Sequence, residues 1–414
     1  MPRAITRCRI CENERLVSLL DLGDQYLTGV FPKSPNEPLT KGPLELVKCE
    51  GDHACGLVQL RHSYDSSEMY GANYGYRSGL NRSMVEHLRA KVAKLTALAA
   101  PRSGDLVLDI GSNDGTLLSF YPPELTTVGM DPTAAKFREF YQPRVEVIAD
   151  FFSAAGFKAR FGERRAKIVT SIAMFYDLDE PIKFVEQVAE ILDEDGIWHF
   201  EQSYLPTMLE QNAYDTVCHE HVEYYALEQI KWMTDRCGLK IVGLEVNDVN
   251  GGSFALTVAR KSSALPEDTN ALSAMLQAEQ DLGLDTLKPY QAFRERVFEH
   301  REKLLTILVD LARRGAKVLG YGASTKGNVI LQFCGLTPAQ IPAIAEVNPD
   351  KFGRFTPGSA IPIISETEAH AMQPDYLLVL PWHFRSNLVQ REAAYLQRGG
   401  RMIFPLPKIE VFGQ

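Results

Sequence analysis

The strongest constraint on the fold is the alternation of short β-branched runs with helical segments between residue 105 and about residue 241. The runs LVLDIG, TTVGMD, VEVIAD, KIVTSIAM and GIWHFEQ are typical of strands. A strand SFALTVARK follows, then a stretch of helical periodicity from about residue 267 to 314, and then a second series, KVLGYGAS, IPAIAEVN, DYLLVLPW and RMIFPL. Because strands that alternate with helices form mostly parallel sheets covered on both faces, the sequence predicts an α/β protein with two such units.

Length, charge and hydropathy exclude several classes of protein. A chain of 414 residues exceeds what one hydrophobic core usually serves, so we expect two or three domains. Its net charge of −9 argues against a nucleic-acid binder, which needs a basic face. No run approaches the ~20 apolar residues of a membrane span, and the first residues lack the apolar core of a signal peptide. We therefore expect a cytoplasmic protein with no membrane or nucleic-acid partner.

Four of the seven cysteines lie within the first 55 residues: Cys8, Cys11, Cys49 and Cys55. This segment is too small to fold on its apolar residues alone, and two pairs of thiolates suit a structural zinc ion. The second pair is spaced more widely than Cys-x-x-Cys, so His53 is an alternative ligand in place of Cys49. Unpaired buried thiols are the other alternative. A catalytic zinc is disfavoured because four protein ligands leave no open position.

Acidic residues stand at the ends of three successive predicted strands. The carboxyl ends of parallel strands meet at one edge of a sheet, where a carboxylate is placed to bind a ribose diol. The glycine turn after the first strand, which we expect to open a helix, does not have the dinucleotide spacing and offers no lysine for a pyrophosphate. The pattern instead predicts a pocket for a cationic nucleoside, S-adenosylmethionine, with a chance arrangement as the alternative. The candidate cofactor residues are Asp109, Gly111, Asn113, Asp131, Asp150 and Phe151.

The segment HEHVEYY follows the fifth predicted strand. Its histidines, His219 and His221, are two residues apart, and this is not the H-E-x-x-H spacing of zinc proteases. We therefore favour proton transfer over metal binding, with His221 or Glu220 as the base and Tyr224 or Tyr225 as a hydrogen-bond donor. The position beyond a strand of a cofactor-binding sheet supports this interpretation. A solvated loop with incidental histidines is the alternative.

The glycine series GYGASTKGN starts at Gly320, follows a predicted strand and opens a helix. It is one residue longer between its second and third glycines than the dinucleotide fingerprint. A helix N-terminus carrying Ser324, Thr325 and Lys326 suits a phosphate group. A purely structural strand-to-helix turn is equally consistent with the pattern.

Taken together, several motifs resemble those of the sugar C-methyltransferases that act on nucleotide-linked 4-keto-deoxysugars, the group that includes tetronitrose C-3'-methyltransferase. The resemblance covers essentially the whole chain. The residues that carry it are the cysteine pairs with the following Gly56-Leu57-Val58, Tyr74-Gly75-Tyr76, Asp109 to Gly115, Glu220-His221 and Gly320 to Ser324.

This resemblance implies a zinc-binding module (residues 1–70), a Rossmann-like S-adenosylmethionine-dependent methyltransferase domain (71–260) and a C-terminal Rossmann-like domain that completes the cleft (261–414). It also implies that His221 is the base, with Glu220 beside it, and that Tyr76 lines the active site. Tyr74, Tyr176, His219 and Lys326 are candidate substrate residues. In two places the chain departs from its relatives: Cys218 stands where they carry a tyrosine, and Tyr176 where some carry a histidine.

The expected reaction is C-methylation of a nucleotide-linked keto sugar, because a carbon next to a ketone is acidic enough to be deprotonated. His221 would remove the proton, and Tyr76 or Tyr224 would stabilise the enolate oxygen. Three alternatives are a sugar O-methyltransferase using the same cofactor, a non-catalytic nucleotide-binding protein and a nicotinamide-dependent oxidoreductase. We expect a monomer or weak oligomer.

Overall fold

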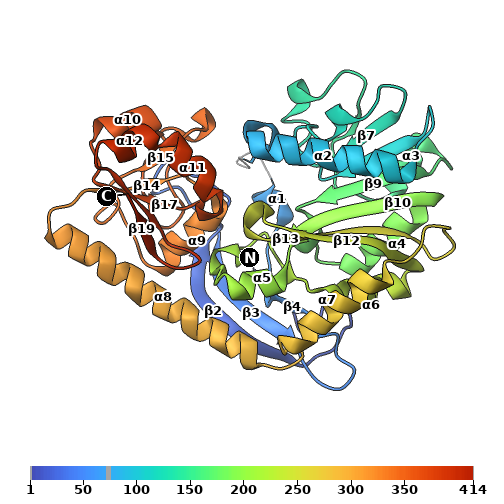
Figure 1. Ribbon diagram of the computed structural model, residues 1–414, viewed down its shortest axis with the longest axis horizontal. Coiled ribbons are helices and arrows are strands. Elements are labelled where there is room, and N and C mark those ends of the chain that lie inside the picture. The colour runs from blue at the N-terminus through green and yellow to red at the C-terminus, as the bar shows by residue number, and fades with distance from the viewer. Residues whose placement is uncertain (1, 71–75, 414) are drawn as a thin grey trace.

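The structure is a computed structural model that describes residues 2–70 and 76–413. Its strands form a seven-stranded, a six-stranded, a four-stranded and a two-stranded sheet. Figure 1 shows the C-terminal sheet on the left, the central sheet on the right, and the blue N-terminal strands below and between them. The predicted α/β class with two Rossmann-like units is confirmed. The boundaries of the three domains remain a prediction.

The central sheet has the strand order β12-β13-β10-β9-β6-β7-β8. Neighbours from β10 to β8 are parallel, whereas β13 runs antiparallel to both β10 and β12. The order reverses between β6 and β9, and ligands of open α/β sheets bind in the crevice at such a point. The strands are β6 (Leu106–Ile110), β7 (Thr126–Met130), β8 (Glu146–Ile148), β9 (Ala166–Ile172), β10 (Leu192–Ser203), β12 (Leu239–Asn247) and β13 (Ser253–Arg260).

Helices accompany this sheet. The predicted apolar repeat Met84, Leu88, Val92 and Leu95 forms the buried face of α2, which begins after the Asn81 cap. The α-helices of this region are α2 (Arg82–Ala99), α3 (Ala154–Phe161), α4 (Pro181–Ile191), α5 (Leu205–Glu210) and α6 (Leu227–Arg236). Short 3-10 turns are η1 (Ser78–Leu80), η2 (Leu118–Phe120), η3 (Arg138–Phe140), η4 (Phe175–Asp177), η5 (Tyr214–Thr216) and η6 (Val249–Gly251).

The turn after β6 does not open an α-helix, contrary to the prediction. The Asp114 carboxylate accepts hydrogen bonds from the backbone N–H and the hydroxyl of Thr116, which holds a tight turn, and only the 3-10 turn η2 follows. Pro122 and Pro123 then come shortly after its end, and proline cannot continue a helical hydrogen-bond ladder.

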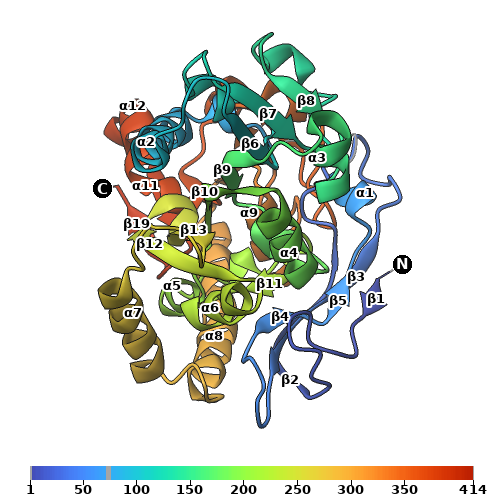
Figure 2. The same ribbon diagram turned by 90° about the vertical axis from the view of Figure 1, so that its right-hand side faces the viewer.

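The N-terminal region forms an antiparallel sheet of order β11-β4-β3-β2. Three of its strands come from the first 60 residues, but β11 (Glu223–Tyr224) directly follows the HEH segment. Glu223 pairs with Gln59 and Tyr224 with Val58, and Figure 2 shows β11 beside β4. The remaining elements here are β1 (Arg3–Ala4), β2 (Leu16–Tyr26), β3 (Lys41–Cys49), β4 (Val58–Leu60), β5 (His62–Ser63) and α1 (Ser66–Met69).

The C-terminal sheet has the order β16-β15-β14-β17-β18-β19, parallel except for β19. Its strands are β14 (Val318–Tyr321), β15 (Ile344–Glu346), β16 (Ile363–Ser365), β17 (Tyr376–Val379), β18 (Arg401–Phe404) and β19 (Glu410–Phe412). Its helical elements are α9 (Thr325–Phe333), α10 (Glu366–Ala371), α11 (Arg385–Arg391), α12 (Ala393–Gln397), η7 (Pro349–Lys351) and η8 (Trp382–Phe384).

The single helical stretch predicted before this sheet is two helices, α7 (Thr269–Asp281) and α8 (Lys288–Arg313). Gly283, with a φ of 71°, lies between them, and Pro289 stands in the first turn of α8, where proline is tolerated. Figure 1 shows α8 running along the lower edge of the molecule beneath the C-terminal sheet. None of the described helices is long and apolar enough to cross a bilayer.

Candidate active site

A cleft of about 1370 Å³ lies between the carboxyl ends of the central and C-terminal strands. The N-terminal region contributes Gly29 and Phe31, the central sheet the turns after β6, β7 and β9, and the C-terminal sheet the turns after β14, β15 and β17. The volume exceeds the ~300–1,000 Å³ usual for a single small-molecule site. The cleft therefore has room for two ligands.

The turn after β6 forms the acidic half of the cleft. Gly111 and Asn113 both have positive φ, 72° and 51°. The Asn113 N–H donates to the Asp131 carboxylate at 2.9 Å, which ties this turn to the end of β7. Asp109 lies deeper, where the Thr170 hydroxyl donates to it at 2.6 Å and burial raises its pKa to about 7. Carboxylates at two strand ends beside a left-handed turn fit a cationic nucleoside with a ribose diol.

The Asn113 side chain also holds the segment that crosses over this turn. Its Oδ1 accepts from the Ser78 N–H at 3.0 Å, and its Nδ2 donates to the Tyr76 carbonyl at 3.1 Å. Tyr76 itself is half exposed and lines the cleft.

Five of the six predicted cofactor residues line the cleft: Asp109, Gly111, Asn113, Asp131 and Phe151. Asp150 does not. Strand β8 already ends at Ile148, and the exposed Asp150 carboxylate accepts a hydrogen bond from the Phe151 N–H at 2.8 Å. The strand is shorter than predicted, so its expected acidic end lies outside the site.

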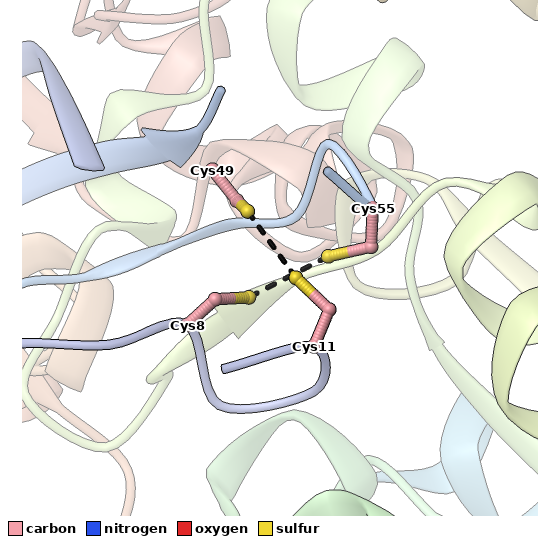
Figure 3. Close-up of side chains that lie close together, drawn as sticks. All are labelled: Cys8, Cys11, Cys49 and Cys55. Atoms are coloured by element: carbon pink, nitrogen blue, oxygen red, sulfur yellow. Dashed lines mark hydrogen bonds between the residues drawn. The ribbon is translucent and has the colours of Figure 1, made fainter. Parts of the chain in front are cut away.

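The predicted metal ligands come together. The sulfur atoms of Cys8, Cys11, Cys49 and Cys55 all lie within 4.8 Å of one another, and Figure 3 shows the four side chains converging. A tetrahedral Zn²⁺ with Zn–S bonds of ~2.3 Å places its sulfurs about 3.8 Å apart, which fits this cluster. Asn13 donates to the Cys49 sulfur at 3.2 Å and so orients a ligand. His53 is exposed and outside the cluster, so the alternative of His53 replacing Cys49 is wrong.

The imidazole of His221 is held by a hydrogen bond and a ring contact. Its Nδ1 lies 2.9 Å from the Thr216 carbonyl, and because a carbonyl only accepts, Nδ1 carries the proton and Nε2 keeps its lone pair. The ring packs edge-on against Tyr176, with centroids 4.3 Å apart. Burial, reinforced by the nearby Lys326 ammonium, lowers the pKa of His221 to about 3. The imidazole is therefore neutral at pH 7, with no proton on Nε2.

The carboxylate of Glu220 is held by the N-terminal region. The Thr28 hydroxyl donates to it at 3.2 Å, and burial raises its pKa. A Cβ atom on Gly29 would collide with a Glu220 oxygen, so only glycine leaves space for this carboxylate. Glu220 thus connects the loop that carries His221 to the module that carries the cysteines.

Two predicted residues, Tyr224 and His219, lie outside the cleft. The Tyr224 hydroxyl donates at 3.3 Å to the Thr216 carbonyl, the same carbonyl that accepts from the His221 ring. His219 is fully buried with its ring 4.6 Å from that of Tyr64. Both lie in or beside the strand β11, whose pairing with β4 turns them into the protein. Tyr176 and Lys326 line the cleft, and Tyr74 lies outside the described residues.

Sequence reasoning missed Asp177 and its partner Tyr70. The Tyr70 hydroxyl donates to Asp177 at 2.7 Å, both line the cleft, and burial raises the pKa of Asp177 well above its ordinary range. Asp177 follows the fourth predicted strand closely, so the strand-end rule used for the first three acids would have found it. Thr28 and Gly29 carried no comparable signal, because their role depends on a contact with a residue far along the chain.

Three family models match successive parts of the chain. Residues 8–70 match the family described as "Putative zinc binding domain", residues 84–244 match "Methyltransferase domain", and residues 248–407 match "C-methyltransferase C-terminal domain". Among solved structures, an S-adenosylmethionine-dependent methyltransferase from Clostridium acetobutylicum is 13% identical with a TM-score of 0.33, covering 42% of this chain and 92% of that one. An O-methyltransferase family protein from Burkholderia thailandensis is 17% identical with a TM-score of 0.37, covering 49% and 64%.

The fold, the cleft and the family matches define an S-adenosylmethionine-dependent methyltransferase with a structural zinc site. C-methyltransferase NovU from Streptomyces niveus is 30% identical over 418 residues, which cover 99% of this chain and 97% of that protein. The chain belongs to the C-methyltransferase family.

Proposed function

We propose that this enzyme methylates a sugar carbon next to the ketone of a nucleotide-linked 4-keto-deoxysugar, in deoxysugar biosynthesis. The observation that carries the proposal is the His221 imidazole, which lines the cleft with its Nε2 lone pair available. Carbon becomes nucleophilic only after a proton leaves it, and a neighbouring ketone makes that loss feasible. A neutral base inside a cleft with room for two ligands is what such a reaction needs.

Each residue has a separate role in the proposed reaction. His221 Nε2 takes the proton from the carbon next to the ketone, the C–H electron pair forms the enolate double bond, and the carbonyl pair moves to oxygen. S-adenosylmethionine, when bound, supplies the methyl group: the new C–C bond forms as the C–S bond breaks, with its electron pair staying on sulfur. Asp109, Asp131 and the Gly111 turn would hold that ligand, and His221 returns its proton to water.

The relative NovU supports this proposal only as far as its name, a C-methyltransferase. The sugar, the ketone and the nucleotide are inferred from the chemistry of the site and from the sequence resemblance. We place the sugar nucleotide in the half of the cleft next to the C-terminal sheet. The predicted cytoplasmic location, and a monomeric or weakly associated state without a nucleic-acid partner, belong to the same proposal.

The test is to incubate the purified protein in heavy water with dTDP-, GDP- and CDP-linked 4-keto-6-deoxyhexoses, with and without labelled S-adenosylmethionine. Mass spectrometry then follows methyl gain and deuterium uptake. We expect a methylated product from at least one sugar, and deuterium exchange next to its ketone. Methylation of the reduced 4-hydroxy sugars without exchange would contradict the proposal and identify an O-methyltransferase.

A further inference from the structure

We propose that Lys326 is a catalytic residue whose ammonium group stabilises the enolate oxygen that His221 creates. The inference rests on the proposed function and deepens it. It changes the role that the sequence indicates for Lys326, which is phosphate binding. It also supplies an oxyanion partner inside the cleft, whereas the Tyr224 hydroxyl donates to the Thr216 carbonyl and does not line the cleft.

The fold mounts Lys326 beside the base. Lys326 lies in the first turn of α9, after the Ser324 cap, and α9 packs against η5. That 3-10 turn contains Thr216, whose carbonyl orients the His221 ring. Lys326 thus stands on a helix that contacts the turn whose carbonyl holds the His221 ring, and both side chains line the cleft.

The ammonium group is fixed from the opposite side of the cleft. Its Nζ donates to the Asn250 carbonyl at 2.9 Å, in the turn between β12 and β13. An ammonium group has three N–H donors. Among the residues that the structure describes, the Asn250 carbonyl is the acceptor that the Lys326 ammonium contacts. The remaining donors are available to a ligand in the cleft.

Lys326 stands where helix energetics oppose a cation. The N-terminal turn of a helix carries a partial positive charge, so a lysine there is destabilising. Burial lowers the pKa of Lys326 as well, although the Asp215 carboxylate acts in the opposite direction. Asp215 is shared, since its Oδ2 accepts from the Trp382 indole at 2.7 Å. A cation at this position therefore suits an anion that binds or forms in the cleft during function.

The neighbourhood of the base favours an enolate over a phosphate as that anion. Burial and, after it, the Lys326 ammonium lower the pKa of the His221 imidazole, and both side chains line the same cleft. Negative charge forms on the ketone oxygen in the same step that His221 takes the proton from the adjacent carbon. A cation near His221 keeps the imidazole neutral beforehand and is near the oxygen when the charge develops, as electrostatic catalysis requires.

The experiment measures proton abstraction separately from nucleotide binding. Full-length Lys326→Met is compared with the wild type for deuterium uptake from heavy water, using the 4-keto-6-deoxyhexose nucleotide that the wild type exchanges, without S-adenosylmethionine. Calorimetry gives the affinity of both proteins for the matching nucleoside diphosphate, dTDP, GDP or CDP. We expect exchange to fall by ~100-fold or more, as when one oxyanion donor is removed, with diphosphate affinity within about threefold. Lys326→Arg should recover part of the exchange.

Lys317→Met is the matched control, because Lys317 immediately precedes β14, at the opposite end of the strand from the cleft, and donates to the Met372 carbonyl. It should exchange at the wild-type rate. Exchange by Lys326→Met within tenfold of the wild type would overturn the Lys326 proposal alone. An equal loss of diphosphate affinity and exchange would return Lys326 to phosphate binding. Absence of exchange in the wild type with every sugar would overturn the proposed function itself.

Discussion

The turns after β6 and β14 share one frame. Gly111 and Gly322 come directly after these strands, with φ of 72° and 83°. At the end of the neighbouring strand an acid accepts from each turn: Asp131 from the Asn113 N–H and Glu346 from the Ala323 N–H, both at 2.9 Å. Each sheet therefore builds a left-handed turn tied to an acid beside the common cleft.

The two turns lead into different elements. The second turn opens α9, whose first helical residues bring Lys326 into the cleft, whereas the first leads only to the 3-10 turn η2. Both acids are occupied further: the other oxygen of Glu346 accepts from the N–H groups of Val347 and Asn348, and that of Asp131 from the N–H and hydroxyl of Thr133. The same turn geometry thus gives an acidic pocket after β6, where no α-helix follows, and a basic site after β14, where α9 follows. The element after the turn decides which charge a ligand meets.

The largest expected effect concerns the zinc site, on which neither turn should depend. We expect Cys55→Ser, or zinc removal with a chelator, to unfold β3, β4 and β11, because structural zinc contributes on the order of 10 kcal/mol to small domains. Each turn rests on its own sheet and should survive. Hydrogen-exchange mass spectrometry should show lost protection in those strands and retained protection in β6, β7, β14 and β15. Equal loss in all of them would mean that the turns have no independent stability.

A second test compares two histidines that line the cleft, His221 and His383. His221→Asn should reduce methyl transfer by about 10²–10⁴-fold, the usual contribution of a general base, and leave S-adenosylmethionine affinity nearly unchanged. His383→Asn is the control, since His383 lines the same cleft from η8. Its turnover should stay within tenfold of the wild type. Substantial activity in His221→Asn would remove His221 as the base.

The two acids provide a matched pair. Asp131→Asn should weaken S-adenosylmethionine binding by about tenfold or more, because hydrogen bonds to a charged group contribute ~1.5–3 kcal/mol. Glu346→Gln removes the equivalent charge from the other frame and should leave that affinity within about threefold. Calorimetric titration of both variants decides the matter. Similar losses of affinity in the two variants would show that both acids contribute equally to S-adenosylmethionine binding.

A further test separates the two glycines. An added Cβ at Gly322 would lie 2.6 Å from the rigid Pro381 ring, whereas one at Gly111 would meet the flexible Met174 side chain at 3.1 Å. Both substitutions also place alanine at positive φ, which disfavours a side chain. We expect Gly322→Ala to cost about 2–3 kcal/mol and Gly111→Ala about 1 kcal/mol. Thermal unfolding of the two variants should therefore rank Gly322→Ala as the less stable, and the reverse order would contradict this account of the packing.

Local patterns predicted the parts of the molecule that depend on local physics. The strand runs, the apolar face of α2, the start of α9 and the convergence of four cysteines all follow from spacing that the chain shows within a few dozen residues. The absence of a helix after β6 was missed, because a side-chain hydrogen bond and two prolines outweighed the strand-turn-helix pattern. The places of Tyr224 and His219 could not be predicted either, since they depend on β11 pairing with a strand from a distant part of the chain.

That pairing bears on how the protein is made. The ribosome releases β4 early, but its partner β11 lies beyond the midpoint of the chain, so the N-terminal sheet waits for more than half of synthesis. Pairings between such distant segments lengthen the loop that folding must close and slow the reaction. His221 lies just before β11 in the cleft-facing loop. The loop that carries His221 consequently reaches its final position late in folding, long after the four cysteines have been synthesised.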